Sequence, residues 1–159
     1  MLALTIGTAV TVACAGRISE PANPSPGTPR VSWIIMSGDR DNADQNFVCQ
    51  SNPRNDCVMP VSRPDADVFS AVYVYYHGAG GETTYSGSIQ IGFFRGSDDT
   101  RTFKPTVTVR KTESISNQSL TAIVTSTPGT YAMTFTMVAT SADSGASQPI
   151  REQVDVVVK

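Results

Sequence analysis

The sequence predicts an all-β fold, a single β-sandwich of about seven or eight antiparallel strands over residues 30–159. The chain of 159 residues contains 18 Thr and 17 Val but only 3 Leu, so β-branched residues replace the usual helix formers. From residue 30 onward, apolar and polar residues alternate with period two, and turn residues interrupt the alternation at short intervals. An apolar share of 40% at this length supports one hydrophobic core, which excludes a disordered chain.

The charge of the chain excludes one large class of partners. The formal net charge is −2 and the isoelectric point is near 5.2. Proteins that bind nucleic acid present a basic surface to its phosphates. We therefore expect no nucleic-acid partner.

Two short segments precede the predicted domain. Residues 2–15 are an uncharged apolar run of 14 residues, shorter than the roughly 20 residues of a membrane-spanning helix. Such a run is typical of the hydrophobic region of a secretory signal. The next residues are rich in proline, which is typical of an extended linker. The chain therefore divides into a signal-like segment 1–13, a linker 14–29 and a domain 30–159.

The junction of the first two segments contains a cysteine in a recognisable context. Thr11, Val12, Ala13 and Cys14 resemble the lipobox of bacterial lipoproteins, although that family prefers Leu at the position of Thr11 and a basic residue before the apolar run. The resemblance implies that Cys14 is acylated and becomes the new N-terminus. Acyl chains would then hold the domain at a membrane. The alternative is an unmodified cysteine within an ordinary cleaved signal.

The resemblance also implies a location. Ala15 follows the cysteine, and in lipoproteins of double-membrane bacteria a residue other than Asp at this position is compatible with sorting to the outer membrane. We therefore expect an exported protein that is lipid-anchored in the cell envelope, at the outer membrane or cell surface. At about 3.1 Å per residue, an extended linker of roughly fifteen residues would reach on the order of 45 Å from the bilayer.

The other two cysteines lie close together in the sequence. Cys49 and Cys57 are separated by seven residues that include the turn residues Asn52 and Pro53. In an oxidising compartment this spacing predicts a local disulfide. A zinc site is the competing interpretation, but His77 is the only histidine and the chain offers no convincing set of four ligands.

The period-two pattern predicts the strands of the domain in order. They cover residues 31–36, 45–49, 68–76, 84–94, 105–111, 120–124, 132–140 and 153–159. Trp33 is expected in the core or on a sheet face. Residues 68–76 are apolar on both faces, which predicts a central strand that is covered on both sides. The glycine-rich residues 78–81 predict a hairpin between this strand and the strand at 84–94.

The end of the chain carries a second resemblance. Pro128, Gly129 and Tyr131 form a turn before an alternating strand, and the final strand places alternating valines on one face. This pattern resembles the last two strands of immunoglobulin-like sandwiches in bacterial surface proteins. The resemblance implies an immunoglobulin-like fold in which Tyr131 packs back at a corner. An ordinary interior tyrosine is the alternative, and periodicity does not separate a sandwich from a jelly roll or a closed barrel.

The sequence offers no coherent catalytic set. His77 and the glycines after it resemble the oxyanion loop of α/β-hydrolase esterases. However, the chain contains no Gly-x-Ser-x-Gly motif and no second histidine to serve as a general base. Asp65 and Asp67 are interpreted as turn residues rather than as the carboxylate pair of a glycosidase. We therefore expect no catalytic residue, no enzyme activity and no organic cofactor.

Two groups of residues are candidates for ligand binding. Asp39, Asp41 and Asp44 supply oxygen donors in one loop, as calcium requires, and a solvated loop is the alternative. The second group consists of aromatic residues on two successive strands. They are interpreted as a platform that binds a sugar or a peptide, and ordinary core packing is the alternative. The candidate ligand-binding residues of this group are Tyr75, Tyr76, His77 and Tyr85.

These observations predict a non-catalytic envelope lipoprotein. We expect an adhesive, accessory or assembly module that binds an envelope protein through a sheet edge or face, because open edges accept added strands. The alternative function is a carbohydrate-binding or calcium-binding sandwich at the cell surface.

Overall fold

The computed structural model describes residues 27–41, 45–96 and 100–159. The predicted signal-like segment, Cys14 and most of the linker lie outside these residues, so the expectations for them stay predictions. The described residues form an all-β sandwich. They include no helix that is long and apolar enough to span a bilayer.

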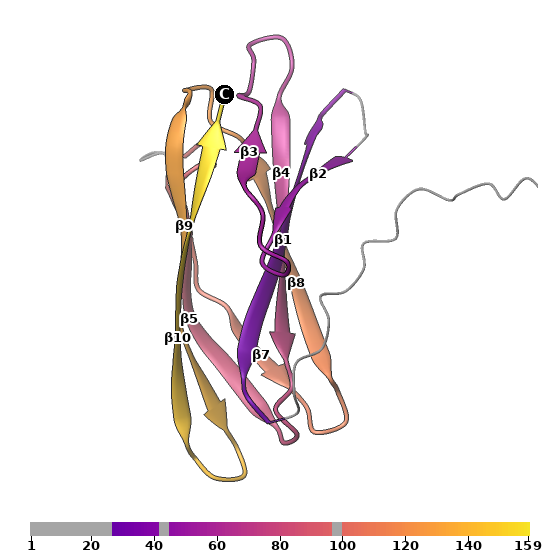
Figure 1. Ribbon diagram of the computed structural model, residues 1–159, viewed down its shortest axis with the longest axis vertical. Coiled ribbons are helices and arrows are strands. Elements are labelled where there is room, and N and C mark those ends of the chain that lie inside the picture. Colours follow the sequence, from indigo (N-terminus) through magenta and orange to yellow (C-terminus); the bar gives the residue numbers. More distant parts are fainter. Residues whose placement is uncertain (1–26, 42–44, 97–99) are drawn as a thin grey trace, which may run out of the picture.

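Ten strands of the described residues lie in two layers (Figure 1). The first sheet has the order β2-β1-β4-β8, and the second has the order β3-β10-β9-β5-β6, with β7 also paired to β5. The strands are β1 (Arg30–Asp39), β2 (Gln45–Gln50), β3 (Cys57–Met59), β4 (Val68–His77), β5 (Thr83–Ile91), β6 (Arg101–Phe103), β7 (Thr106–Val109), β8 (Ile115–Ile123), β9 (Gly129–Ser141) and β10 (Ser147–Val158).

The inner faces of both sheets supply one hydrophobic core. Alternate residues of β1 and β4 face alternate residues of β5, β9 and β10, as period two requires. Trp33 of β1 is fully buried, and its indole Nε1 donates to Glu152 Oε1 on β10 at 3.1 Å. This contact links the two sheets through a side-chain hydrogen bond, because a buried indole N–H needs an acceptor.

The predicted hairpin at residues 78–81 is wrong. β4 pairs with β1 and β8 in the first sheet, whereas β5 pairs with β9, β6 and β7 in the second. The glycine-rich connection therefore crosses from one layer to the other. Tyr76 and Tyr85 are opposed across the layers, with ring centroids 5.3 Å apart. The apolar side chains of β4 and β5 bury more surface when the two strands face each other from different sheets than when they pair within one sheet. The alternation of apolar and polar residues is the same in both arrangements, so it does not distinguish them.

The prediction of only antiparallel strands also needs correction. β3 runs parallel to β10, with Cys57 opposite Val156 and Met59 opposite Val158. β3 and β6 have three residues each, which is too short for period two to be recognised in the sequence. The other eight strands overlap the predicted ranges, with β8 starting five residues earlier than expected.

Tyr131 lies at the start of β9, where the chain turns into the second sheet. Its hydroxyl donates to the carbonyl oxygen of Thr127 at 2.8 Å. The ring also packs against the core. The side chain of Tyr131 therefore ties the turn at Thr127 to β9.

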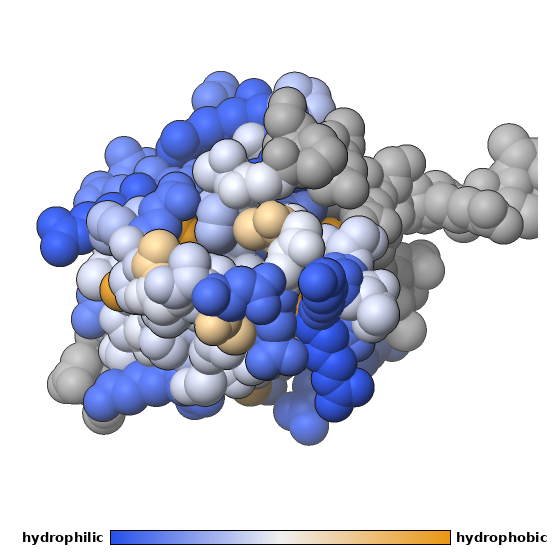
Figure 2. Space-filling view, turned by 90° about the horizontal axis from the view of Figure 1, so that it is seen from below, coloured by the Kyte–Doolittle hydropathy of each residue, from blue (hydrophilic) through white to orange (hydrophobic). Residues whose placement is uncertain are grey.

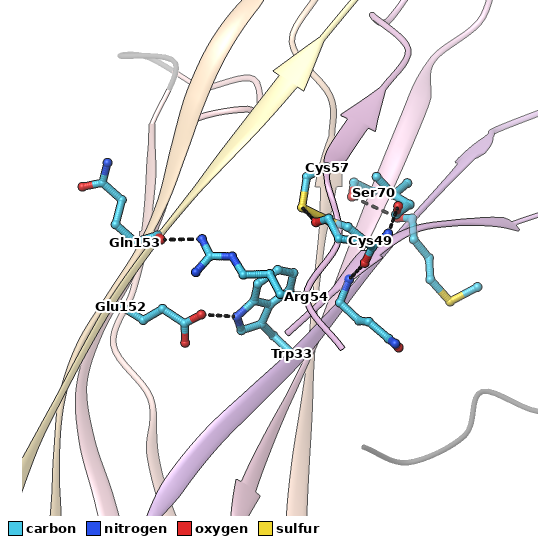
Figure 3. Close-up of a disulfide and its surroundings, with 11 residues drawn as sticks. Trp33, Cys49, Arg54, Cys57, Ser70, Glu152 and Gln153 are labelled. Carbon is cyan, nitrogen blue, oxygen red and sulfur yellow. Dashed lines mark hydrogen bonds between the residues drawn. A yellow bond between two sulfur atoms is a disulfide. The ribbon is translucent and has the colours of Figure 1, made fainter. Parts of the chain in front are cut away.

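The structure contains the Cys49–Cys57 disulfide that the sequence predicts. Cys49 lies on β2 of the first sheet and Cys57 on β3 of the second, so a bond that is local in sequence joins the two layers (Figure 3). Both cysteines belong to the core. The disulfide therefore limits separation of the sheets at this edge.

Gly87 gives a test of how closely β5 and β9 approach. Gly87 has φ +147°, and a Cβ atom there would lie 2.3 Å from Thr136 O and 2.7 Å from Met137 Cα. Gly87→Ala is therefore expected to lower the free energy of unfolding by roughly 2 kcal/mol or more, because backbone atoms must shift. Urea denaturation of the purified protein measures this change.

Gly96→Ala is the matched control for Gly87→Ala. The nearest atom to a Cβ at Gly96 is Arg101 Cγ, 3.6 Å away on a flexible side chain. This variant should change stability by no more than about 0.5 kcal/mol. Equal losses in both variants would contradict the close approach at Gly87.

Candidate functional site

The side of the first sheet that faces away from the core is unusually apolar. Strand register places Tyr73 opposite Ile34, and Met36 between Phe47 and Ala71. Directly opposed residues share a face. All five lie outside the core cluster, which takes the intervening residues of the same strands. Because the described residues form only two sheets, no third sheet covers this surface.

We call this surface the outer face and define it by four aromatic residues above a buried aliphatic layer. Phe47 is 52% exposed, whereas Ile34 and Met36 are buried. The other aromatic residues are partly exposed and occupy alternate positions of β4. The four are Phe47, Phe69, Tyr73 and Tyr75. The prediction that β4 is central is confirmed, but its outer side remains accessible at the aromatic rings.

Three of the four predicted ligand-binding residues are buried. Tyr76 and Tyr85 face the core and are fully buried, and His77 is 1% exposed. They do not form the expected surface platform. Tyr75 is partly exposed on the outer face. The sequence could not show which tyrosines face the other sheet. It also missed Phe47 as a binding residue, although it predicted the strand that carries Phe47.

His77 lies in a buried polar cluster with Arg30 and Ser32. Arg30 Nη2 lies 3.4 Å from His77 Nδ1, and Ser32 Oγ lies 2.7 Å from His77 Nε2. A guanidinium group only donates hydrogen bonds, so Nδ1 is the acceptor and Nε2 carries the proton of the neutral ring. Nε2 therefore donates to Ser32, whereas a serine nucleophile requires a nitrogen that accepts its proton. The cluster has the geometry of a structural hydrogen-bond network.

Tyr85 connects this cluster to the second sheet. Its hydroxyl donates to the carbonyl oxygen of His77 and accepts from the backbone N–H of Arg30 at 3.1 Å. Burial raises the pKa of Tyr85 to about 12, with Arg30 acting in the opposite direction. Burial also raises the pKa of Tyr76, which donates to Gln118, to about 12. Both hydroxyl groups therefore stay neutral at physiological pH.

The proposed calcium ligands are only partly described. Asp39 Oδ1 accepts the backbone N–H of Asp41 at 2.9 Å, which is an Asx turn. Asp44 lies outside the described residues. Within them, no group of three or more His, Cys, Asp or Glu side chains is placed to hold a metal ion.

The lower end of the sandwich, as oriented in Figure 1, offers no continuous apolar surface. Figure 2 shows small hydrophobic patches there, separated by hydrophilic and neutral residues. Large apolar surfaces are the usual marks of binding sites. The sheet faces and edges are therefore the stronger candidates.

The outer edge of β2 is occupied by a side chain. Asn55 Oδ1 accepts the backbone N–H of Gln50 at 3.0 Å, and Asn55 Nδ2 donates to the carbonyl oxygen of Val48 at 3.4 Å. The amide group thus takes the place that the peptide of an added strand would hold. A bulge between Ile35 and Met36 further disturbs this edge.

The edges of the second sheet are also blocked. Beside β10, Arg54 Nη2 donates to the carbonyl oxygen of Gln153 at 3.1 Å (Figure 3), and Pro149 has no N–H to offer. β6 and β7 are only three and four residues long. Charged residues and a proline lie within or beside them: Arg101, Lys104, Pro105, Arg110 and Lys111. Short strands, charges and proline all discourage strand addition.

The remaining edge belongs to β8 and has none of these features from Ile115 to Thr121. At Ile123 the carbonyl oxygen already accepts the backbone N–H of Arg95 at 2.8 Å, beside the bridge of Phe94 with Val124. β8 has nine residues, pairs only with β4 within the described residues, and contains no charged residue or proline. Ser119 and Thr121 are exposed on its outward side. We call this the β8 edge. Together with the adjoining outer face, it forms the candidate functional site.

The buried His77 predicts a specific loss of stability in acid. Burial, and then the positive charge of Arg30, lowers the pKa of His77 to about 4 from 6.5. Below pH 6.5 the unfolded chain takes up a proton that the folded protein does not. The free energy of unfolding should therefore fall between pH 6.5 and pH 4, by at most about 3 kcal/mol from this residue.

His77→Gln is the comparison for this pH effect, because glutamine does not titrate. Urea denaturation of both proteins from pH 8 to pH 4 isolates the histidine contribution as the difference between the two curves. The difference between the free energies of unfolding of the wild type and of His77→Gln should become smaller or change sign as the pH falls. Parallel curves over this range would contradict a neutral buried His77.

No protein-family model matches the chain, and no curated protein matches it either. We therefore infer its function from the contacts, burial and charges of its own residues.

Proposed function

We propose that this protein is an exported, lipid-anchored module of the bacterial cell envelope that binds a protein partner through the β8 edge and the outer face. It works without catalysis, as an adhesive, accessory or assembly component. The β8 edge is the single observation that carries this proposal. An open strand offers a row of backbone donors and acceptors, and the outer face beside it offers aromatic contact area.

An immunoglobulin-like topology for the domain is part of the proposal. The order β1-β4-β8 corresponds to strands A, B and E of that fold, and β10-β9-β5 corresponds to strands G, F and C. The hydrogen bond from Tyr131 to Thr127, at the start of β9, has the form of the tyrosine corner. Trp33 departs from the pattern, because it lies on β1 rather than on the strand that corresponds to C.

This correspondence explains why the β8 edge is open. In a constant-type immunoglobulin sheet, strand D lies beside strand E. In the described residues β6 and β7 both pair with β5 in the second sheet, and a single bridge of Phe94 with Val124, just past the end of β8, is all that stands where D would lie. An added strand from a partner would fill that position.

Export is supported by the N-terminal pattern and by the cysteines of the domain. Cys14 follows an apolar run and precedes a proline-rich linker, in the order found in lipoproteins. Cys49 and Cys57 form a disulfide, a bond that persists in oxidising compartments and is rare in the cytosol.

A carbohydrate ligand is the second candidate. It is favoured by the three aromatic residues at alternate positions of β4, since Phe69, Tyr73 and Tyr75 share one face. Planar rings on a sheet are suited to apolar contact with a sugar. Soluble glycans that raise the melting temperature of the wild type, but not of Tyr73→Ala, would favour this candidate.

The lipid anchor predicts a defined mass for the mature protein. Cleavage before Cys14 and acylation should give an N-terminal cysteine that carries two or three acyl chains. Intact-mass spectrometry of the protein purified from its own cells measures this. Cys14→Ser should abolish the acyl mass, and an unmodified chain starting at Met1 would overturn the anchor.

The protein partner predicts a site-specific adduct at the β8 edge. A photo-reactive p-benzoyl-phenylalanine in place of Asn117, which is exposed on β8, should form one discrete adduct in living cells. The same group in place of Thr136, exposed on the central strand β9, is the control and should form none.

Mass spectrometry of the adduct identifies its protein component. An envelope protein at Asn117, lost when Ser119→Lys is also present, supports the proposed function. No adduct, or equal adducts at both positions, would overturn it.

A further inference from the structure

We propose that the partner adds a strand with acidic ends to the β8 edge. This strand pairs antiparallel with residues 115–121 and continues the line of the chain's own residues 93–95. The inference rests on the proposed function, since it names the chemistry of the partner at the same site.

Residues 93–95 show how a strand lies beside β8. The backbone N–H of Arg95 donates to Ile123 O at 2.8 Å, and Phe94 forms an antiparallel bridge just past the end of β8. The ring of Phe94 is fully buried, and its centroid lies 6.4 Å from that of Phe103 on β6. A strand that continues this line therefore pairs with β8 and directs alternate side chains toward the second sheet.

The backbone of β8 leaves a row of hydrogen-bonding groups for such a strand. In an antiparallel ladder, the N–H and C=O of one residue point to the same side, and the side alternates along the strand. Ile123 O accepts from Arg95, so the backbone groups of Ile123 point away from β4. The same then holds for alternate residues before it, which are Ile115, Asn117, Ser119 and Thr121.

The side chains beside this row favour a partner strand with an alternating pattern. On the outer side, Asn117, Ser119 and Thr121 are exposed, and hydroxyl side chains form favourable cross-strand pairs with them. On the inner side, Phe103 and Val107 are only partly buried against the core, and β7 contacts β8. We therefore expect Ser or Thr on the outer side of the partner strand and apolar residues on its inner side.

The charge near this edge favours acidic residues in the partner. Residues 101–111 contain four basic residues and no acidic one, although the whole chain has 12 basic and 14 acidic residues. Asp98 and Asp99, just before this stretch, lie outside the described residues. The four basic residues are exposed, and none forms an ion pair with a described residue: Arg101, Lys104, Arg110 and Lys111. Complementary charge of this kind directs the choice of partner.

Two of these cations lie near the two ends of the open stretch of β8. Arg101 Nε donates to Arg95 O at 3.0 Å, next to the point where an added strand begins. Lys111 lies in the turn that leads into β8, in which Glu113 accepts the backbone N–H of Arg110 at 3.1 Å. The antiparallel direction therefore places the N-terminal end of the partner strand near Arg101 and its C-terminal end near Lys111.

Peptides of defined charge test this inference on the full chain in a mild non-ionic detergent. The probe is a fluorescent, acetylated and amidated peptide of alternating Thr and Val, as long as residues 115–121, with a pair of Glu residues at each end. By fluorescence anisotropy, it should bind at least about tenfold more tightly than the same peptide with Lys at both ends, and this preference should shrink as salt is added.

Charge reversal at Lys111 tests the direction of the strand. Lys111→Glu should weaken binding of the Glu-flanked probe about fivefold or more, and should instead favour a probe with Lys at its C-terminal end only. Arg151→Glu makes the same charge change at an exposed position of β10 and is the matched control, which should leave both affinities unchanged.

A proline at the centre of the edge tests strand addition itself. Ser119→Pro removes an outward N–H without removing a hydrogen bond to β4, and should weaken binding of the probe at least about tenfold. Urea denaturation of this variant checks that it folds. Lys111 is exposed in a turn, so Lys111→Glu is expected to fold and tests the inference independently.

The peptide experiment and the cellular adduct together separate the possible failures. A preference for Glu-flanked peptide that Lys111→Glu reverses at one end supports the inference. Equal binding of the two peptides, no binding up to about 1 mM, or an order of affinities that Lys111→Glu leaves unchanged overturns it. An adduct at Asn117 with a segment that lacks Asp and Glu keeps the proposed function and rejects the acidic strand. No adduct rejects the proposed function, whatever the peptides show.

Discussion

The passage of the chain from β4 to β5 is the constraint on which the rest of the structure depends. Gly78 lies where it begins, and a Cβ atom there would lie only 2.7 Å from Glu113 O. The backbone N–H of Gly78 donates to Ser114 O at 2.8 Å, just before β8 starts. Because the chain crosses here, β4 keeps both of its edges for β1 and β8, and β5 organises the second sheet.

Much of the fold was predictable because it depends on local patterns. The alternation of Val72, Val74 and Tyr76 identifies a buried row whatever sheet it joins. The spacing of Cys49 and Cys57 likewise predicts their disulfide, because a short polar turn brings them together. The same information does not tell whether a glycine-rich connection turns back within a sheet or crosses between sheets, which is decided by distant partners such as Glu113.

The candidate site was less predictable, because it is defined by what surrounds each strand. Nothing in the sequence distinguishes Asn55 and Arg54 from their neighbours, and their role at the edges of β2 and β10 is visible only once the strands are placed. Tyr75 and Tyr76 are adjacent on a strand and must point to opposite sides, but the sequence does not show which side is the core. The β8 edge is recognised by comparison with the other edges, and β8 itself was only half identified.

The ends of the domain have a mechanical consequence. β1 begins and β10 ends at opposite ends of the sandwich (Figure 1). A force applied between Arg30 and Val158 would therefore act along the strands. It would load the hydrogen bonds between β1 and β4, and those between β9 and β10, together in shear rather than opening them one by one.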